Sequence, residues 1–139
     1  TEYAGNIGRM STAGAALEFP LPDQAVRPQG ITTGADGNLW FTEWAGKIGR
    51  STPSGTITEF PIPTAGTQPE GITAGPDGNV WFAERDGNAK GIGRITPSGT
   101  ISEFQTPTLH SQPAGIATGP DGNLWFTESS SGKIGRLTP

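Results

Sequence analysis

The 139-residue chain contains no cysteine and only one histidine, His110. The missing cysteines exclude a disulfide framework, a thiolate metal site and a cysteine nucleophile. A single histidine excludes a multi-histidine metal site within one chain, and it leaves His110 as the one candidate base for Ser–His–Asp chemistry. Long hydrophobic runs are also missing, because the apolar stretches are a few residues long and far short of a membrane span. We therefore expect no membrane partner.

Charged residues are sparse as well. Charged residues make up 16 % of the chain, the net charge is −4, and no basic stripe appears. Nucleic-acid-binding domains concentrate Lys and Arg on one face, so we expect no nucleic-acid partner. The sequence shows no signal peptide and does not begin with Met. Localisation therefore stays open between the extracellular space and the cytoplasm.

Glycine (22 residues) and proline (13 residues) are abundant, and a repeat orders them. Three short strings recur with a spacing of 41 to 44 residues: Ile-Gly-Arg from Ile7, Ile48, Ile92 and Ile134, Asp-Gly-Asn from Asp36, Asp77 and Asp121, and Glu-Phe from Glu18, Glu59 and Glu103. Because three independent markers share one period, the chain is a tandem repeat. The repeat units cover about 1–41, 42–82 and 83–126, and 127–139 repeats the register of 1–13.

One repeat unit predicts four short strands, at 30–33, 38–43, 47–52 and 56–61, separated by turns rich in Gly, Asp and Pro. A four-stranded unit of about 40–45 residues with Gly and Trp is typical of a propeller blade. We therefore expect an all-β fold, a β-propeller of four-stranded antiparallel blades with about three blades in this single domain, 1–139. A β-solenoid or a β-sandwich is less favoured, since solenoid coils are usually shorter and lack four turn signals.

The predicted strands number thirteen, and three blades cannot close a ring. Each flank of such a fan exposes a sheet face with Trp and Phe, which a soluble monomer rarely tolerates. In one explanation a second copy completes the ring: its first outer strand adds to the last three strands of its partner, giving a six-bladed homodimer. In the other explanation the missing blades belong to further sequence. The first explanation is preferred.

Three stretches of the chain resemble a known family. Residues 119–128 (Gly-Pro-Asp-Gly-Asn-Leu-Trp-Phe-Thr-Glu), 132–136 (Gly-Lys-Ile-Gly-Arg) and 53–64 are similar to the blades of the streptogramin B lyase (virginiamycin B lyase-like) family. The resemblance implies a seven-bladed propeller. It also implies an enzyme that opens the lactone-bearing ring of streptogramin B antibiotics by elimination, with a magnesium ion and a histidine base.

The family places a Pro-His pair at the start of the first strand of a blade, near the ring axis. The matching positions here hold no histidine, and they are Gln29, Glu70 and Ala114. An acidic residue stands two positions earlier in one family blade, and here those positions are Arg27, Gln68 and Gln112. We therefore predict no catalytic residue, no metal ligand and no cofactor in this chain, with magnesium expected only if the lyase alternative holds.

The loops on the two faces of the predicted fan differ in variability. Turns between first and second strands and between third and fourth strands barely vary, whereas the other connections vary, and these lie together on the opposite face. That face is the predicted binding site. Its candidate residues are Gln29, Glu70, Ala114, Arg27, Gln68, Gln112, Tyr3 and Trp44. Tyr3 and Trp44 are suited to stacking on a sugar or planar ligand, or else they pack between blades.

The repeated arginines have a structural interpretation. If Glu43 faces Lys47 across a hairpin, Arg50 lies beside Trp40 on the same face, which predicts a cation–π contact.

The sequence thus favours a non-catalytic β-propeller module that assembles from more than one chain and binds a small molecule, glycan or protein on its variable-loop face. Two alternatives remain. One is a streptogramin B lyase-like enzyme whose site is completed by another chain or by missing blades. The other is a structural module that stacks through exposed strand edges.

Overall fold

The computed structural model describes residues 5–24, 26–85 and 91–139, and its regular structure there is entirely β. Thirteen strands follow one another in these ranges: β1 (Asn6–Met10), β2 (Ala16–Pro20), β3 (Pro28–Thr33), β4 (Leu39–Glu43), β5 (Lys47–Ser51), β6 (Ile57–Pro61), β7 (Pro69–Ala74), β8 (Val80–Glu84), β9 (Gly91–Ile95), β10 (Ile101–Gln105), β11 (Pro113–Thr118), β12 (Leu124–Glu128) and β13 (Lys133–Leu137). Within the described part of the chain, no helix is long and apolar enough to cross a membrane.

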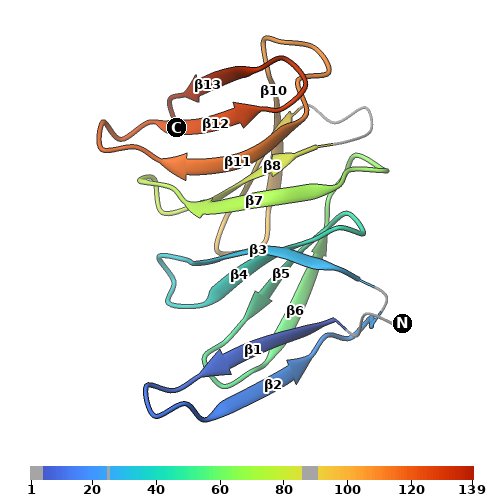
Figure 1. Ribbon diagram of the computed structural model, residues 1–139, viewed down its shortest axis with the longest axis vertical. Helices are drawn as coiled ribbons and strands as arrows, with labels where there is room; N and C mark the ends of the chain where they lie inside the picture. The colour runs from blue at the N-terminus through green and yellow to red at the C-terminus, as the bar shows by residue number, and fades with distance from the viewer. Residues whose placement is uncertain (1–4, 25, 86–90) are drawn as a thin grey trace.

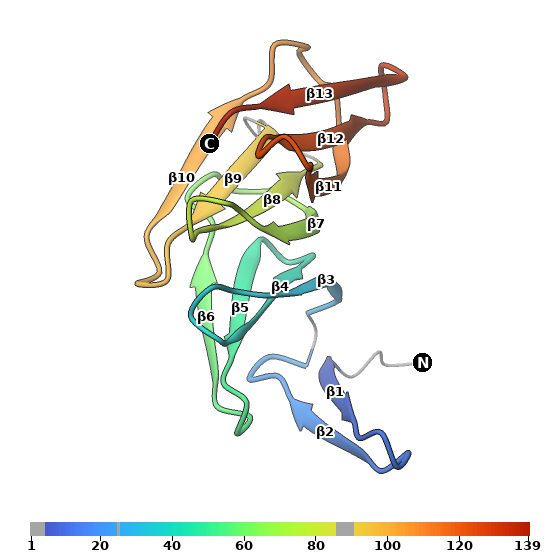
Figure 2. The same cartoon turned by 90° about the vertical axis from the view of Figure 1, so that its left-hand side faces the viewer.

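The strands form four antiparallel sheets in sequence order. Two are complete four-stranded sheets, β3–β4–β5–β6 and β7–β8–β9–β10, flanked by the two-stranded β1–β2 and the three-stranded β11–β12–β13. Figures 1 and 2 show the sheets fanned along a curved row, with β3, β7 and β11 side by side as the innermost strands. The predicted all-β class and the blade-like sheets are confirmed.

The innermost strands begin earlier than the sequence predicted. β3 starts at Pro28 rather than at residue 30, and its register with β4 shifts between Pro28 and Ile31. Across that shift Gln29 and Gly30 lie opposite the single residue Thr42, which is a β-bulge. The resemblance to the family had placed Pro28 and Gln29 at the start of this strand, and the register agrees with that placement. The other predicted strands of this unit agree to within one residue.

The three sheets that contain a tryptophan-bearing second strand each have two different apolar faces. We call the side bearing the second-strand tryptophan the Trp face (Trp40, Trp81, Trp125) and the other side the Phe face (Phe41, Phe82, Phe126). In the first full interface, Trp40 and Ile48 pack against Ile72, Val80 and Phe82 of the next sheet. The next interface repeats this pattern, with Trp81 and Ile92 against Leu124 and Phe126. Because consecutive side chains of a strand point to opposite faces, a second strand between two sheets carries apolar side chains on successive residues, as at Leu39, Trp40 and Phe41.

The repeated arginines extend these interfaces, as the sequence predicted. Glu43 pairs with Lys47 across the β4–β5 hairpin. The Arg50 guanidinium carbon lies 5.5 Å from the centre of the Trp40 ring and 5.4 Å from that of Phe60. Its Nη1 also donates a hydrogen bond to the carbonyl of Pro97 in the next sheet, at 3.0 Å. Each such cation–π contact stabilises by about 0.5–2 kcal/mol.

The Asp-Gly-Asn strings form turns. Asp77 Oδ1 accepts hydrogen bonds from the backbone of Asn79 (3.2 Å) and from the indole of Trp81 (3.1 Å). Burial alone would raise the pKa of Asp77, but these hydrogen bonds, with that from the Asn79 amide, hold it below the ordinary value. The carboxylate thus fixes the buried tryptophan from the turn, which explains why the string recurs with the blade.

Both flanks of the single chain are open. On the C-terminal flank Trp125 is 39 % exposed and Ile134 71 %, whereas the equivalent Trp81 and Ile92 are each 1 % exposed. On the N-terminal flank Ile31 is 53 % exposed. These apolar side chains mark where neighbouring strands would pack in a longer array.

Candidate functional site

Two sets of variable loops meet on one face of the fan. In each of three repeats, the first residue after the second strand donates a backbone hydrogen bond to the residue before the innermost strand. The pairs are Trp44 N to Arg27 O (2.9 Å), Arg85 N to Gln68 O (3.1 Å) and Ser129 N to Gln112 O (3.2 Å). These bonds hold the two sets together, as the alternation of strand connections predicted.

The three positions that match the family's histidine lie in three equivalent bulges. Each innermost strand shifts register after its first proline, so that Gln29, Glu70 and Ala114 occupy the bulge. The next residue in each case is a glycine. A Cβ on Gly30 would come within 2.7 Å of the Glu70 carbonyl oxygen, so the innermost strands approach backbone to backbone. Bulges often redirect side chains beside binding sites.

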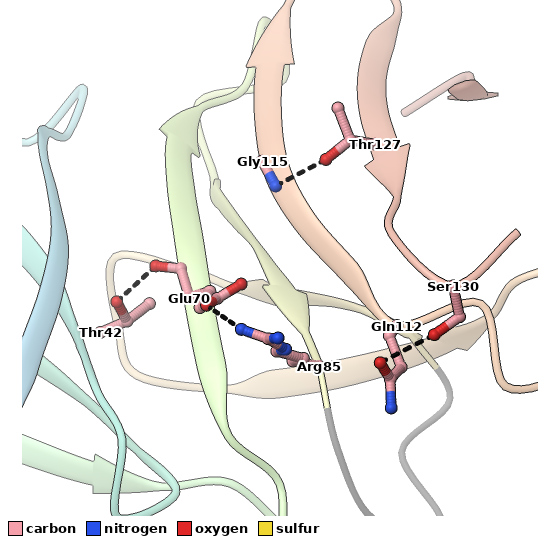
Figure 3. A network of polar contacts seen from close by, with 7 residues as sticks. All are labelled: Thr42, Glu70, Arg85, Gln112, Gly115, Thr127 and Ser130. Carbon is pink, nitrogen blue, oxygen red and sulfur yellow. Dashed lines mark hydrogen bonds and ion pairs between the residues drawn. The ribbon is translucent and has the colours of Figure 1, made fainter. Parts of the chain in front are cut away.

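Glu70 is held by an ion pair in this arrangement (Figure 3). Its Oε1 accepts a hydrogen bond from Arg85 Nη1 at 2.7 Å, and both side chains are partly exposed. Its backbone carbonyl accepts a second hydrogen bond, from the Thr42 hydroxyl of the preceding sheet, at 2.7 Å. Both the backbone and the carboxylate of Glu70 are therefore fixed, and the carboxylate keeps acceptor capacity for a ligand.

Gln112 is positioned by its own loop contacts. Its Oε1 accepts a hydrogen bond from the Ser130 hydroxyl at 2.7 Å (Figure 3). Its φ of 48° places the backbone in the left-handed region, where residues other than glycine are uncommon. His110, two residues earlier, has a φ of 54° and an exposed side chain. The structure therefore leaves the single histidine of the chain on the loop, outside the bulge.

The other candidates vary in exposure. Arg27 and Gln29 are exposed, whereas Ala114, Gln68 and Trp44 are partly buried. Tyr3 lies outside the described residues, as do residues 86–90 of one variable loop.

Two polar partners on this face were not singled out from the sequence. Arg85 and Ser130 were recognised only as members of variable loops, yet they contact Glu70 and Gln112. Both residues follow the second strand of a sheet within two positions, next to the bulge of the same sheet. This position in the repeat could have identified them from the sequence.

The three bulge positions and their described partners do not fit a magnesium site. Glu70 is the one carboxylate among the three bulge positions, and a guanidinium already engages it. Magnesium in proteins usually needs one or two carboxylates in near-octahedral geometry. Within 5–24, 26–85 and 91–139 no three residues of the types His, Cys, Asp and Glu are grouped so that they could hold a metal.

The model of the virginiamycin B lyase family matches residues 1–139. The chain is similar to the solved selenomethionine-substituted virginiamycin B lyase of Staphylococcus aureus, with 48 % identity, a TM-score of 0.93, and coverage of 99 % of this chain and 47 % of that one. A streptogramin B lyase structure gives 43 % identity, a TM-score of 0.92, and coverage of 99 % and 46 %.

A third match is a catalytically inactive variant of the S. aureus enzyme with quinupristin, at 50 % identity and a TM-score of 0.90, covering 96 % of this chain and 45 % of that one. Comparison with curated proteins gave no match. The chain spans about half the length of these solved relatives. Because the family model covers every residue, the chain belongs to the virginiamycin B lyase family.

Proposed function

We propose that this chain is a non-catalytic sector of a lyase-like β-propeller, and that it binds a cyclic peptide lactone on its variable-loop face. The observation that supports this most is the set of three equivalent bulges, which carry Gln29, Glu70 and Ala114 where the resemblance implies a histidine. The solved relative with quinupristin supplies the ligand class.

The chemistry of these positions favours binding over proton transfer. A general base must accept a proton near the working pH, and neither an amide nor a methyl group does so. The Glu70 carboxylate is paired with Arg85 at 2.7 Å, so the pair must open before Glu70 takes a proton from a ligand. Amide and carboxylate oxygens suit the backbone N–H groups of a cyclic peptide, and the partly exposed Trp44 suits its aromatic side chains.

Titration of the 139-residue chain with quinupristin, followed by calorimetry, tests this function. We expect saturable binding whose affinity is the same with and without magnesium. Glu70→Gln should weaken binding about tenfold, because a charge-assisted hydrogen bond is lost. Thr58→Ala, an exposed position on the outer strand β6, is the control and should bind like the original chain.

Absence of binding would contradict the proposal. Ring opening at an enzymatic rate with magnesium would instead support the lyase alternative, which the 43–50 % identity to solved lyases favours.

We also propose that a second copy of this chain completes the ring. Trp125 on the C-terminal flank and Ile31 on the N-terminal flank are exposed apolar residues. They hold the same repeat positions as Trp40 and Ile72, which pack together in the first full interface. β13 and β1 share Ile-Gly-Arg in the same register. β13 of one copy can therefore replace β1 and pair with β2 of another copy. The sheet β1–β2 has no tryptophan-bearing second strand, and β12 of the first copy would supply one.

Light scattering of the purified chain measures this assembly. We expect a discrete particle of twice the 14.4 kDa chain mass. A folded 14.4 kDa monomer at micromolar concentration would contradict the proposal, since both apolar flanks would then face water.

A further inference from the structure

A buried carboxylate without a hydrogen-bonding partner lies at the end of β4, next to Trp44. Glu43 is 0 % exposed, and neither of its carboxylate oxygens has a partner among the described residues. It lies across from Pro28 on β3 and Lys47 on β5. Burial without a partner strongly disfavours the charged form of a carboxyl group.

Glu43 belongs to the interface between the N-terminal strands and the first complete sheet. It lies two residues along β4 from Phe41, so both side chains point to the Phe face. Phe41 packs there against Ile7 of β1 and against Leu21 and Val26 of the connection between β2 and β3. A charge on Glu43 would therefore sit between β1–β2 with its connection and the sheet β3–β6.

The nearby charged groups do not offset this burial. Lys47, the β5 residue across from Glu43, is paired with Glu59 of β6 at 2.7 Å. Burial first, then the negative charge of Glu59, raises the pKa of Glu43 from 4.5 to about 7, with a smaller contribution from Asp23 and only partial opposition from Lys47.

The charged residues of the N-terminal strands have partners elsewhere. Arg9 of β1 donates to the carbonyl of Pro53, and Glu18 of β2 accepts a hydrogen bond from Asn6. Glu128 occupies the same repeat position as Glu43 and is also buried, but its Oε2 accepts a hydrogen bond from the Ser131 hydroxyl at 2.9 Å. Glu128 therefore provides a matched control.

We propose that Glu43 is a proton-binding switch that couples pH near neutrality to the packing of β1–β2, Leu21 and Val26 against the first complete sheet. With the proton bound, the neutral side chain fits the apolar interface. Loss of the proton leaves a charge there, and the connection must move to admit water. The same connection carries Arg27, whose carbonyl holds the Trp44 backbone at 2.9 Å. The switch thus regulates the proposed ligand face, and only this last step rests on the proposed function.

The raised pKa of Glu43 determines how the stability of the fold changes with pH. Between 4.5 and about 7 the folded state binds a proton that the unfolded state releases, so stability falls as pH rises through this window. From pH 5 to pH 8 the unfolding equilibrium constant should rise by roughly 10- to 100-fold. Glu43→Gln keeps the shape without the charge, so it should match the original chain at pH 5 and be more stable at pH 8.

Urea unfolding at pH 5 and pH 8 measures both effects, with Glu128→Gln as the control that should keep the original pH dependence. A Glu43→Gln chain with an unchanged pH dependence would overturn the proposal. NMR titration of the Glu43 carboxyl carbon in the unmodified chain needs no variant. A midpoint near 7 supports the switch, and a midpoint near 4.5 overturns it. Neither measurement uses a ligand, so failure of the proposed function leaves this test intact.

Discussion

Trp81→Ala is expected to lower the free energy of unfolding by about 3–5 kcal/mol, whereas Trp125→Ala is expected to act mainly on assembly. Trp81 is 1 % exposed and packs against Leu124 and Phe126 of the next sheet. Trp125 holds the same repeat position, but no following sheet covers it within the described chain, and it is 39 % exposed. Its removal should therefore cost the isolated fold only about 1 kcal/mol.

Chemical unfolding at low protein concentration and light scattering across a concentration series separate the two effects. Trp125→Ala should shift the particle toward the single-chain mass, because the proposed contact between copies loses its largest apolar side chain. Equal unfolding free energies for the two variants would contradict the expectation that the cost of losing a tryptophan depends on whether a following sheet covers it. An unchanged particle mass for Trp125→Ala would show that the C-terminal flank is not the contact between copies.

Gly71→Ala is expected to destabilise the chain by about 2–3 kcal/mol, because the added methyl group has no space between the innermost strands β7 and β11. Its Cβ would lie 2.4 Å from the Ala114 carbonyl oxygen and 3.0 Å from the Ile116 backbone nitrogen. Both atoms belong to the backbone of β11, so no side chain can move aside. The variant must push β7 and β11 apart, which also displaces the bulge that carries Glu70.

Gly115→Ala is the matched control, since its Cβ would meet only Thr127, at 3.4 Å from the hydroxyl oxygen. Thermal and urea unfolding should place this variant within about 0.5 kcal/mol of the original chain at concentrations where copies are separate. If Gly71→Ala proved as mild as Gly115→Ala, the close approach of the innermost strands would be wrong.

The repeat made the fold largely predictable from the sequence. The period, the Asp-Gly-Asn turns and the successive apolar residues of the second strands predicted the order and number of strands, because each depends on local backbone preferences. The contact of Arg50 with Trp40 was equally predictable, since hairpin register fixes which side chains share a face.

The candidate site was only partly predictable. The sequence singled out Glu70 and Gln112 by position, but not their partners Arg85 and Ser130, because pairing across two connections depends on how the loops fold. The bulges at Gln29, Glu70 and Ala114 were missed as well. An extra residue in one strand becomes visible only when the opposite strand is aligned beside it.

The Thr42 hydroxyl, which joins Gly30 N (2.9 Å) to the Glu70 carbonyl (2.7 Å), has no counterpart in the next sheet, where Ala83 stands at that position. β7 and β11 are instead fastened at their far end, where the Thr118 hydroxyl donates to the Ala74 carbonyl at 2.6 Å. At the Glu70 end these two strands are held by the close backbone approach of Gly71 to Ala114, and their sheets by the apolar packing of Trp81 against Leu124 and Phe126. Between these two sheets, apolar contact therefore takes the role that a hydroxyl has between β3 and β7.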